Sequence, residues 1–198
     1  VDDINLIKTP DHQLICTDEV IGGWWLGYQG PAGGLGQDYS FYPLSQASAN
    51  PYTFECVLKN NGAITQSATL KVEVEDGSGT NLFSGSSVAL VLASGEQDTI
   101  AAATQFTPTA IGSYTAIMYA ESDSAGAGII MNYTDTSTKM SVVTEHIYGK
   151  DFNLSDGSWR LNRINPQPGG FEVSSNYDIY SDVDLYSVDV HVSDWSIP

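Results

Sequence analysis

Basic residues are scarce in this sequence. Its 198 residues include 7 Lys and Arg against 24 Asp and Glu, which gives a formal net charge of −17 at pH 7. A chain this acidic repels phosphate groups, so we expect it to bind neither nucleic acid nor an anionic membrane surface. No apolar run approaches the roughly 18 residues of a membrane-spanning helix, and the sequence therefore predicts no membrane span.

The motifs of common catalytic sites are absent as well. The chain contains no GxSxG, HExxH, GxGxxG or Walker A pattern. Its three histidines, His12, His146 and His191, lie far apart in sequence, and none has a neighbouring Cys or Ser in a known catalytic arrangement. The sequence therefore predicts a protein that is not an enzyme and that carries no catalytic cofactor.

Only two cysteines are present, Cys16 and Cys56. A disulfide between them would close a loop of about 40 residues and stabilise the fold by about 3–4 kcal/mol. Alternatively, Cys56 is a small core residue, because it lies on the apolar side of a segment between Phe54 and Leu58. Both interpretations stay open. The sequence has no CxxC pair, which excludes a structural zinc site of the usual kind.

Charged residues are few, whereas glycine and tyrosine are abundant. Asp, Glu, Lys and Arg make up 16% of the chain, which also holds 19 Gly and 11 Tyr, while soluble domains average about 25% charged residues. Hydroxyls, amides and acids must therefore form most of the surface. This composition suits short strands and turns better than long helices, so we expect an all-β protein in an extracellular setting.

Alternation of apolar and polar residues places the strands. The pattern is clearest over residues 52–59, 68–75 and 114–120, and turn residues such as Asn60-Asn61-Gly62 follow or separate these segments. Strands that recur every 8–12 residues predict an antiparallel β-sandwich, which we place at residues 45–144. Its predicted core includes Phe54, Leu58, Leu70, Val72, Val74, Tyr114 and Met118.

Two different segments flank the predicted sandwich. Residues 1–44 form a Gly-rich leading segment that we expect to pack on the sandwich, with some strand character at residues 39–42. Residues 145–198 are rich in turns and hold one well-patterned strand, at 183–192. Because a sandwich needs roughly 100 residues, we interpret 145–198 as an incomplete second β domain. Further sequence, another subunit or docking on the first domain would complete it.

Three runs of the sequence resemble a known family. They are DYSFYPLSQASANPYTFECVLKNNGAITQSATLKVEV, GSYTAIMYAESD and HIYGKDF. Together they resemble a CARDB-like, immunoglobulin-like β-sandwich module of secreted Bacteroidetes surface proteins or type IX-secreted multidomain proteins. The run GGFEVSSNYDIYSDVDLYSVDVHV resembles the start of the jelly-roll-like module that often follows. The resemblance covers about residues 38–198, and it implies architecture and location without a catalytic motif.

The aromatic run of the leading segment is the main candidate for ligand binding. Trp24, Trp25 and Tyr28 lie in a Gly-rich stretch, with Gln37 and Asp38 nearby. Exposed aromatic rings stack on sugars while polar neighbours bind hydroxyls, which would make this a carbohydrate-binding site. Large aromatics are more often buried, so we favour packing on the sandwich or on a partner protein.

Acidic residues cluster near the C-terminus. Asp178, Asp182, Asp184 and Asp189 fall within twelve residues, and carboxylates at turns are the ligands that Ca²⁺ takes. The spacing does not match a calcium-binding loop, so we favour a solvated acidic face over a Ca²⁺ site at Asp178, Asp182 and Asp184.

Short modification motifs are also present. Asn132 and Asn153 begin N-x-[ST] triplets. The runs Asp98-Thr99-Ile100 and Asp123-Ser124-Ala125 resemble the Bacteroidetes O-glycosylation motif, which implies sugars on Thr99 and Ser124.

These features predict a non-catalytic module of a larger secreted or cell-surface protein, with a structural, adhesive or spacing role. Its expected partners are other domains of the same polypeptide or a surface protein assembly. One alternative is a carbohydrate-binding module that uses the aromatics of residues 24–42 to bind glycans. A second alternative is an accessory domain of a secreted hydrolase.

Overall fold

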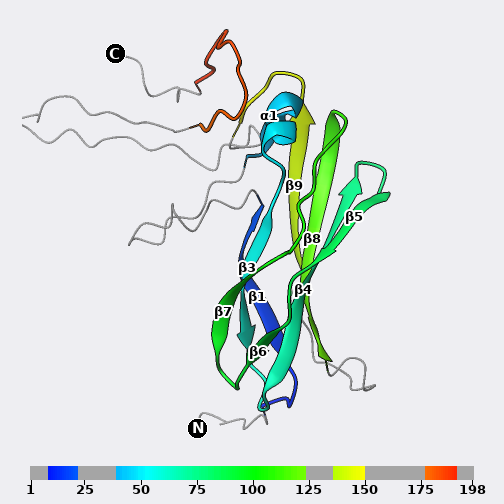
Figure 1. The fold of residues 1–198 in the computed structure, drawn as a ribbon, viewed down its shortest axis with the longest axis vertical. Coiled ribbons are helices and arrows are strands. Elements are labelled where there is room, and N and C mark those ends of the chain that lie inside the picture. The colour runs from blue at the N-terminus through cyan, green and yellow to red at the C-terminus, as the bar shows by residue number, and fades with distance from the viewer. Residues whose placement is uncertain (1–8, 22–38, 124–135, 150–176, 191–198) are drawn as a thin grey trace, which may run out of the picture.

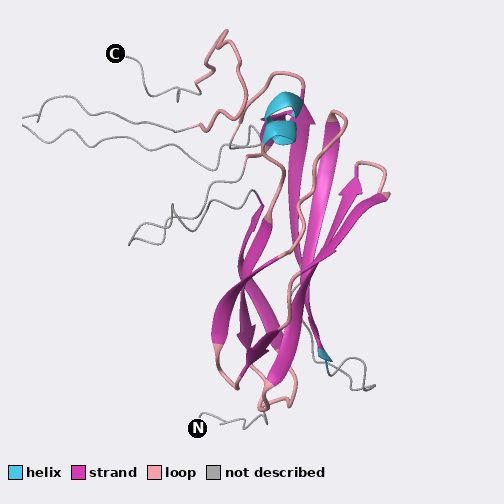
Figure 2. Ribbon diagram, in the orientation of Figure 1, coloured by secondary structure: helices cyan, strands magenta, loops and turns pink. Residues whose placement is uncertain are grey.

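Two β-sheets and one short helix make up the described part of the chain (Figures 1 and 2). The computed structural model describes residues 9–21, 39–123, 136–149 and 177–190. In chain order the elements are β1 (Leu14–Ile21), β2 (Phe41–Pro43), α1 (Leu44–Ala49), β3 (Phe54–Asn60), β4 (Gln66–Asp76), β5 (Asn81–Ser86), β6 (Leu90–Leu92), β7 (Gln97–Ala101), β8 (Gly112–Ser122) and β9 (Ser137–Thr144). In this part of the chain no helix is both long and apolar enough to cross a membrane.

The strands divide between the sheets as in an immunoglobulin-like sandwich. The smaller sheet has the order β1-β3-β7, and the larger has the order β2-β9-β8-β4-β5, with β6 also pairing with β4. Strands B and E of an immunoglobulin-like fold share one sheet, and strands C, F and G share the other. Here β3 and β7 correspond to the first set, and β4, β8 and β9 to the second. The predicted all-β, immunoglobulin-like fold is confirmed.

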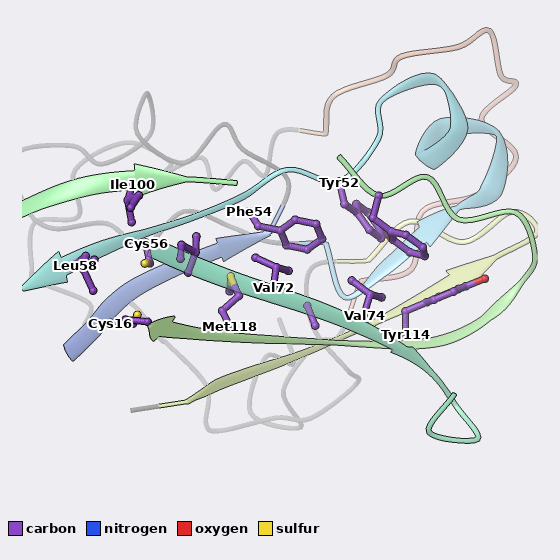
Figure 3. Close-up of a cluster of buried hydrophobic side chains, with 14 of the residues drawn as sticks. Cys16, Tyr52, Phe54, Cys56, Leu58, Val72, Val74, Ile100, Tyr114 and Met118 are labelled. Carbon is purple, nitrogen blue, oxygen red and sulfur yellow. The ribbon is translucent and has the colours of Figure 1, made fainter. Parts of the chain in front are cut away.

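Alternation along the central strands builds the core (Figure 3). In β3 and β4 every second side chain is buried and its neighbours are only partly covered. This is the pattern of strands that have one face on a core and one face toward water. All seven residues that the sequence predicts for the core are at most 6% exposed: Phe54, Leu58, Leu70, Val72, Val74, Tyr114 and Met118.

Strand β1 begins earlier than the predicted sandwich. Its residues belong to the segment that we expected only to pack on the sandwich, yet they pair antiparallel with β3 from Leu14 opposite Asn60 to Ile21 opposite Phe54. The sequence signal is weak because two acidic residues interrupt the alternation, and the register shifts between Thr17 and Val20. The predicted strand character near residue 41 is present as β2, which runs parallel to β9.

A tyrosine secures the crossing into strand β8. Tyr114 lies near the start of β8, and its hydroxyl donates a hydrogen bond to the backbone oxygen of Ala110 at 2.7 Å. A tyrosine that bonds back to the chain a few residues upstream, at the start of strand F, is the tyrosine corner of immunoglobulin-like sandwiches. The alternation of residues 114–120 predicts that Tyr114 is buried, but it does not predict this hydrogen bond.

The two cysteines are core thiols in the structure, without a disulfide between them. Cys16 and Cys56 are 3% and 0% exposed and lie on the neighbouring strands β1 and β3. Cys16 stands opposite Leu58, so Cys56 is its diagonal neighbour. Diagonal neighbours are about 7–8 Å apart, beyond the usual Cα separation of a disulfide. The structure therefore supports the second interpretation, in which Cys56 is a buried core residue.

Residues 177–190 return to the sandwich without adding a strand to it. Figure 1 shows this segment in red next to α1. The sequence predicts a strand at 183–192, and the structure describes this range as far as residue 190. Residues 183–190 have no strand partner among the described residues. The sequence of this segment alternates as a strand does. A strand also needs a neighbouring sheet edge to pair with, and alternation alone does not supply one.

Candidate functional site

Several predicted site residues lie outside the described residues. These are the aromatic and polar candidates Trp24, Trp25, Tyr28, Gln37 and Asp38 and the modification candidates Ser124, Asn132 and Asn153. The carbohydrate-binding hypothesis therefore stays a prediction. Thr99 is described, and it lies exposed on β7, where its backbone N–H donates to Asp98 Oδ1 at 2.8 Å.

The acidic candidates do not gather around a common point. Within the described ranges no three His, Cys, Asp or Glu side chains form a group that could hold a metal ion. Asp178 faces a tyrosine instead, because the Tyr39 hydroxyl donates to its carboxylate Oδ2 at 3.4 Å. Asp182 and Asp184 are exposed. The preference for a solvated acidic face over a calcium site stays a prediction.

Three side chains of the sandwich instead hold the peptide of residues 177–181. They are Tyr39, which precedes β2, Gln46 in α1, and Tyr148, which follows β9. We call these three residues and the peptide the docking cluster. Gln46 and Ser181 are 135 residues apart in sequence, so the cluster forms only when the fold brings distant segments together.

Gln46 makes the central contacts of the docking cluster. Its side chain is fully buried, and its Nε2 donates to the backbone oxygen of Ser181 at 2.9 Å and to Ser181 Oγ at 2.6 Å. Its Oε1 accepts from the backbone N–H groups of Tyr180 at 2.8 Å and Ser181 at 3.1 Å. One amide side chain thus pairs with both donors and acceptors of the peptide, as a neighbouring β-strand would.

Two tyrosine hydroxyls fix the start of the same peptide. The backbone N–H of Asp178 donates to the Tyr39 hydroxyl at 2.8 Å. The Tyr148 hydroxyl donates to the backbone oxygen of Asp178 at 3.0 Å. Most contacts of the docking cluster therefore go to the peptide backbone, and the Asp178 carboxylate and the Ser181 hydroxyl add contacts that depend on side chains.

Stacked tyrosine rings support these hydroxyls. Tyr39 and Tyr42 stack with ring centroids 5.1 Å apart and planes 4° from parallel. Tyr148 meets both rings edge-on at 5.3 and 5.4 Å, and Tyr177 of the docked peptide lies 5.9 Å from Tyr148. Tyr42 also contacts Tyr52 at 5.8 Å, which connects the docking cluster to the sandwich core. Such ring pairs contribute about 0.5–1.5 kcal/mol each beyond their burial.

Burial changes the acidity of these tyrosines. It raises the pKa of Tyr42 and of Tyr52 to about 12 from the usual value of 10.0. Burial also raises the pKa of Tyr39 and of Tyr148. A raised pKa means that the folded protein favours the neutral phenol, because a phenolate would lose its hydration.

Alkaline pH should therefore destabilise the fold. The tyrosines contribute their full stability below pH 10.0, their value in the unfolded chain, and this stability is lost as pH rises toward about 12. We expect the free energy of unfolding to fall steeply between these values, measured by urea unfolding at stepped pH. Tyr42→Phe should make the fall shallower. An equal slope in wild type and variant would contradict this prediction.

The sequence gives only a partial signal for the docking cluster. Tyr39 and Tyr42 belong to the aromatic run of residues 24–42, so an aromatic site near this end of the sandwich could be expected. Nothing in the local sequence marks Gln46 as a buried residue. A single glutamine in a short helix is usually exposed. The Tyr148 role depends on a partner peptide 30 residues further along the chain, which no local pattern encodes.

Beyond the docked peptide, residues 182–190 are exposed and form no strand. Leu185 is 81% exposed, Tyr186 92%, Val188 70% and Val190 73%. Large apolar side chains are rarely left this exposed in a row without a partner.

Comparisons with known proteins provide no family for the chain. No protein-family model matches it, and no curated protein matches it. Solved structures do show likeness. A CARDB domain of a Pyrococcus furiosus protein, crystallised in complex with di-metal ions, is 15% identical with a TM-score of 0.41, and the match covers 70% of this chain and 97% of that one. A Bordetella pertussis protein described as ApaA is 13% identical with a TM-score of 0.35, covering 70% and 100%.

Proposed function

We propose that this chain is a non-catalytic extracellular module that connects and spaces other parts of a larger secreted or cell-surface protein. The docking cluster supports this proposal. Gln46, Tyr39 and Tyr148 hold residues 178–181 against the end of the sandwich, so the following residues leave in a set direction. A spacer needs the chain to leave the sandwich in a fixed direction, because neighbouring domains otherwise move relative to one another by default.

The composition supports the extracellular part of the proposal. A net charge of −17 with only 7 basic residues keeps such a module soluble and away from phosphate-bearing surfaces. The resemblance of residues 38–198 to sandwich modules of Bacteroidetes surface proteins favours secretion by the type IX route. The partners are then neighbouring domains of the same polypeptide or other proteins of a surface assembly.

Replacing Gln46 with Ala tests the docking role directly. The change removes four hydrogen bonds to Tyr180 and Ser181, each worth about 0.5–1.5 kcal/mol. We expect amide hydrogen exchange at Tyr180 and Ser181 to accelerate by at least about 30-fold, which corresponds to the lower end of that sum. Exchange in β3 and β4 should stay slow, because the peptide can leave without opening the core.

A matched control separates docking from general loosening. Gln97 is an exposed glutamine on β7, so Gln97→Ala should leave exchange at Tyr180 and Ser181 unchanged. If Gln46→Ala leaves these two amides as protected as in wild type, then Gln46 does not hold the peptide, and the proposed spacing role loses its main support.

Glycosylation of Thr99 would agree with an extracellular module. Thr99 follows Asp98 in the motif noted above, and it lies exposed on the edge strand β7, within reach of a modifying enzyme. We expect protein from its native source to carry at least one sugar on Thr99 or Ser124, and peptide mass spectrometry would locate it. An intact mass equal to that of the bare polypeptide would rule this out.

A further inference from the structure

The turn that joins β3 to β4, at the lower end of the sandwich in Figure 1, contains Asn61 followed by Gly62. Neither the docking cluster nor the spacing role uses this pair. Asparagine is among the thermolabile residues of proteins, because the backbone nitrogen of the next residue can attack its side-chain amide. Glycine in that next position favours the attack, since it has no Cβ to keep the nitrogen away. The pair is therefore prone to deamidation, and its surroundings decide whether the reaction occurs.

Lack of space, rather than backbone conformation, requires glycine at position 62. Gly62 is buried, and a Cβ there would lie 2.6 Å from the backbone oxygen of Asp11 and 2.9 Å from the backbone nitrogen of Gln13. Both contacts are with backbone atoms, which cannot move aside as the end of a flexible side chain can. Gly62 is not among the described glycines with a positive φ. The packing therefore keeps a glycine after Asn61, although this makes the pair reactive.

The same packing holds the nitrogen that would attack. The Gly62 N–H donates to Asn60 Oδ1 at 2.9 Å and to the backbone oxygen of Gln13 at 3.2 Å. The N–H of Asn61 donates to the same Gln13 oxygen at 2.9 Å. A buried N–H that is hydrogen-bonded in this way loses its proton to hydroxide only when the bonds open. The attack requires loss of that proton, so the closed turn opposes the reaction.

Contacts with other segments keep the turn closed. The Ala63 N–H donates to the backbone oxygen of Pro10 at 2.9 Å, and the Ser94 hydroxyl donates to the backbone oxygen of Gly62 at 2.7 Å. Asn60, which supplies the side-chain acceptor, is itself fully buried. Because these bonds come from both sides of the turn, several of them must break together before the Gly62 nitrogen is free to move.

We propose that Asn61 is a latent deamidation site, which the closed turn protects and which reacts when the turn opens. In the open turn the Gly62 nitrogen forms a bond to Cγ of Asn61, the bond from Cγ to Nδ2 breaks, and the side-chain amide leaves as ammonia with the proton of the attacking nitrogen. Water then opens the resulting succinimide ring to aspartate or to isoaspartate. The inference goes beyond the spacing role, because it assigns a covalent modification to the chain.

The isoaspartate product would prevent the turn from closing again. In isoaspartate the chain continues through Cβ, which adds a carbon to the backbone between residues 61 and 62. The N–H groups of these two residues would then no longer match the single Gln13 oxygen to which both donate. An opening that ends in reaction is therefore permanent, and the modified fraction of the protein reports how often the turn opens.

Incubation of the full chain in native buffer and in guanidinium chloride, at the same mildly alkaline pH, tests this inference. Peptide mass spectrometry follows the mass gain at position 61, and chromatography separates the isoaspartate product. We expect the folded chain to deamidate at least about tenfold more slowly than the unfolded chain, because reaction requires opening. Asn61→Ala should remove the mass gain from this peptide. Equal rates in the two solvents would overturn the inference.

Two variants separate protection by the turn from the stability of the whole domain. Asn60→Ala removes one of the two acceptors of the Gly62 N–H, so deamidation in native buffer should be at least about threefold faster. Val74→Ala weakens the core at β4, where Val74 is 1% exposed, but it leaves the turn contacts intact and should react at the wild-type rate. Unchanged deamidation in Asn60→Ala, or equal acceleration in both variants, would show that the turn contacts do not protect Asn61.

A milder pair of variants replaces Asn60→Ala if circular dichroism shows that it is unfolded. Ser94→Ala removes the hydroxyl that donates to the backbone oxygen of Gly62 and should accelerate deamidation at least about twofold. Ser113→Ala alters an exposed serine of β8 and should leave the rate unchanged. Faster reaction in Ser94→Ala alone supports the inference, and equal rates in the two serine variants overturn it.

Discussion

Replacing Val72 with Asp is expected to lower the free energy of unfolding by at least about 4 kcal/mol, most of the stability of a typical small domain. Val72 is 1% exposed and lies on β4, between Met118 of β8 and Gly85 of β5. A carboxylate there would be buried without a partner, or it would have to take up a proton. Urea unfolding followed by circular dichroism measures the loss.

The neighbouring residue provides the control. Lys71 points to the other face of β4 and pairs with Glu121 at 3.0 Å on a largely solvated surface. Lys71→Ala should therefore cost no more than about 1 kcal/mol. If Val72→Asp unfolds at the same urea concentration as wild type, the side chains of β4 face the opposite way, which is a shift of the strand register by one residue.

Replacing Asn60 with Ala should cost about 3 kcal/mol or more. Asn60 is fully buried at the end of β3, and its Nδ2 donates to the backbone oxygens of Ile64 at 2.8 Å and Leu92 at 3.0 Å. Its Oδ1 accepts from the backbone N–H of Gly62 at 2.9 Å and from Gln66 Nε2 at 2.6 Å. Alanine would remove all four of these hydrogen bonds; the Gly62 N–H would keep its bond to the backbone oxygen of Gln13 at 3.2 Å, whereas a buried group left without a partner carries a desolvation penalty.

Two further variants show whether the hydrogen bonds are the cause. Asn60→Asp keeps the shape but replaces both donors with an acceptor, so it should be at least as unstable as Asn60→Ala. Asn61→Ala alters a residue that is only partly buried and should unfold within about 0.5 kcal/mol of wild type. The midpoints of thermal unfolding of the three variants, measured beside wild type, give their order of stability. Equal midpoints for Asn60→Ala and wild type would contradict the prediction.

Strands with regular alternation could be predicted from sequence, and interrupted ones could not. The core of β3, β4 and β8 follows from a period of two, and Asn60-Asn61-Gly62 correctly ends β3. From the sequence, β1 belongs to the flanking segment, because its alternation breaks at Asp18 and Glu19. In the structure, backbone pairing with β3 forms the strand despite this weak local pattern. Tertiary contacts override weak local signals of this kind.

The docking cluster was beyond sequence reasoning for a different reason. Its polar contacts join positions 134 to 139 residues apart for Gln46 and Tyr39, and periodicity reports only on neighbours along the chain. Asp178, Asp182 and Asp184 are metal candidates in the sequence because a carboxylate is recognisable from the residue type alone. The structure uses the backbone of Asp178 for docking, and a backbone group has no sequence signature.

The docked peptide also determines how the protein carries load. A pull on residue 190 reaches the sandwich first through Gln46, Tyr39 and Tyr148, and only after these bonds break does the force travel along the chain to β9. The docking cluster would therefore be the first part of the protein to yield under load, before any strand of the sandwich is strained.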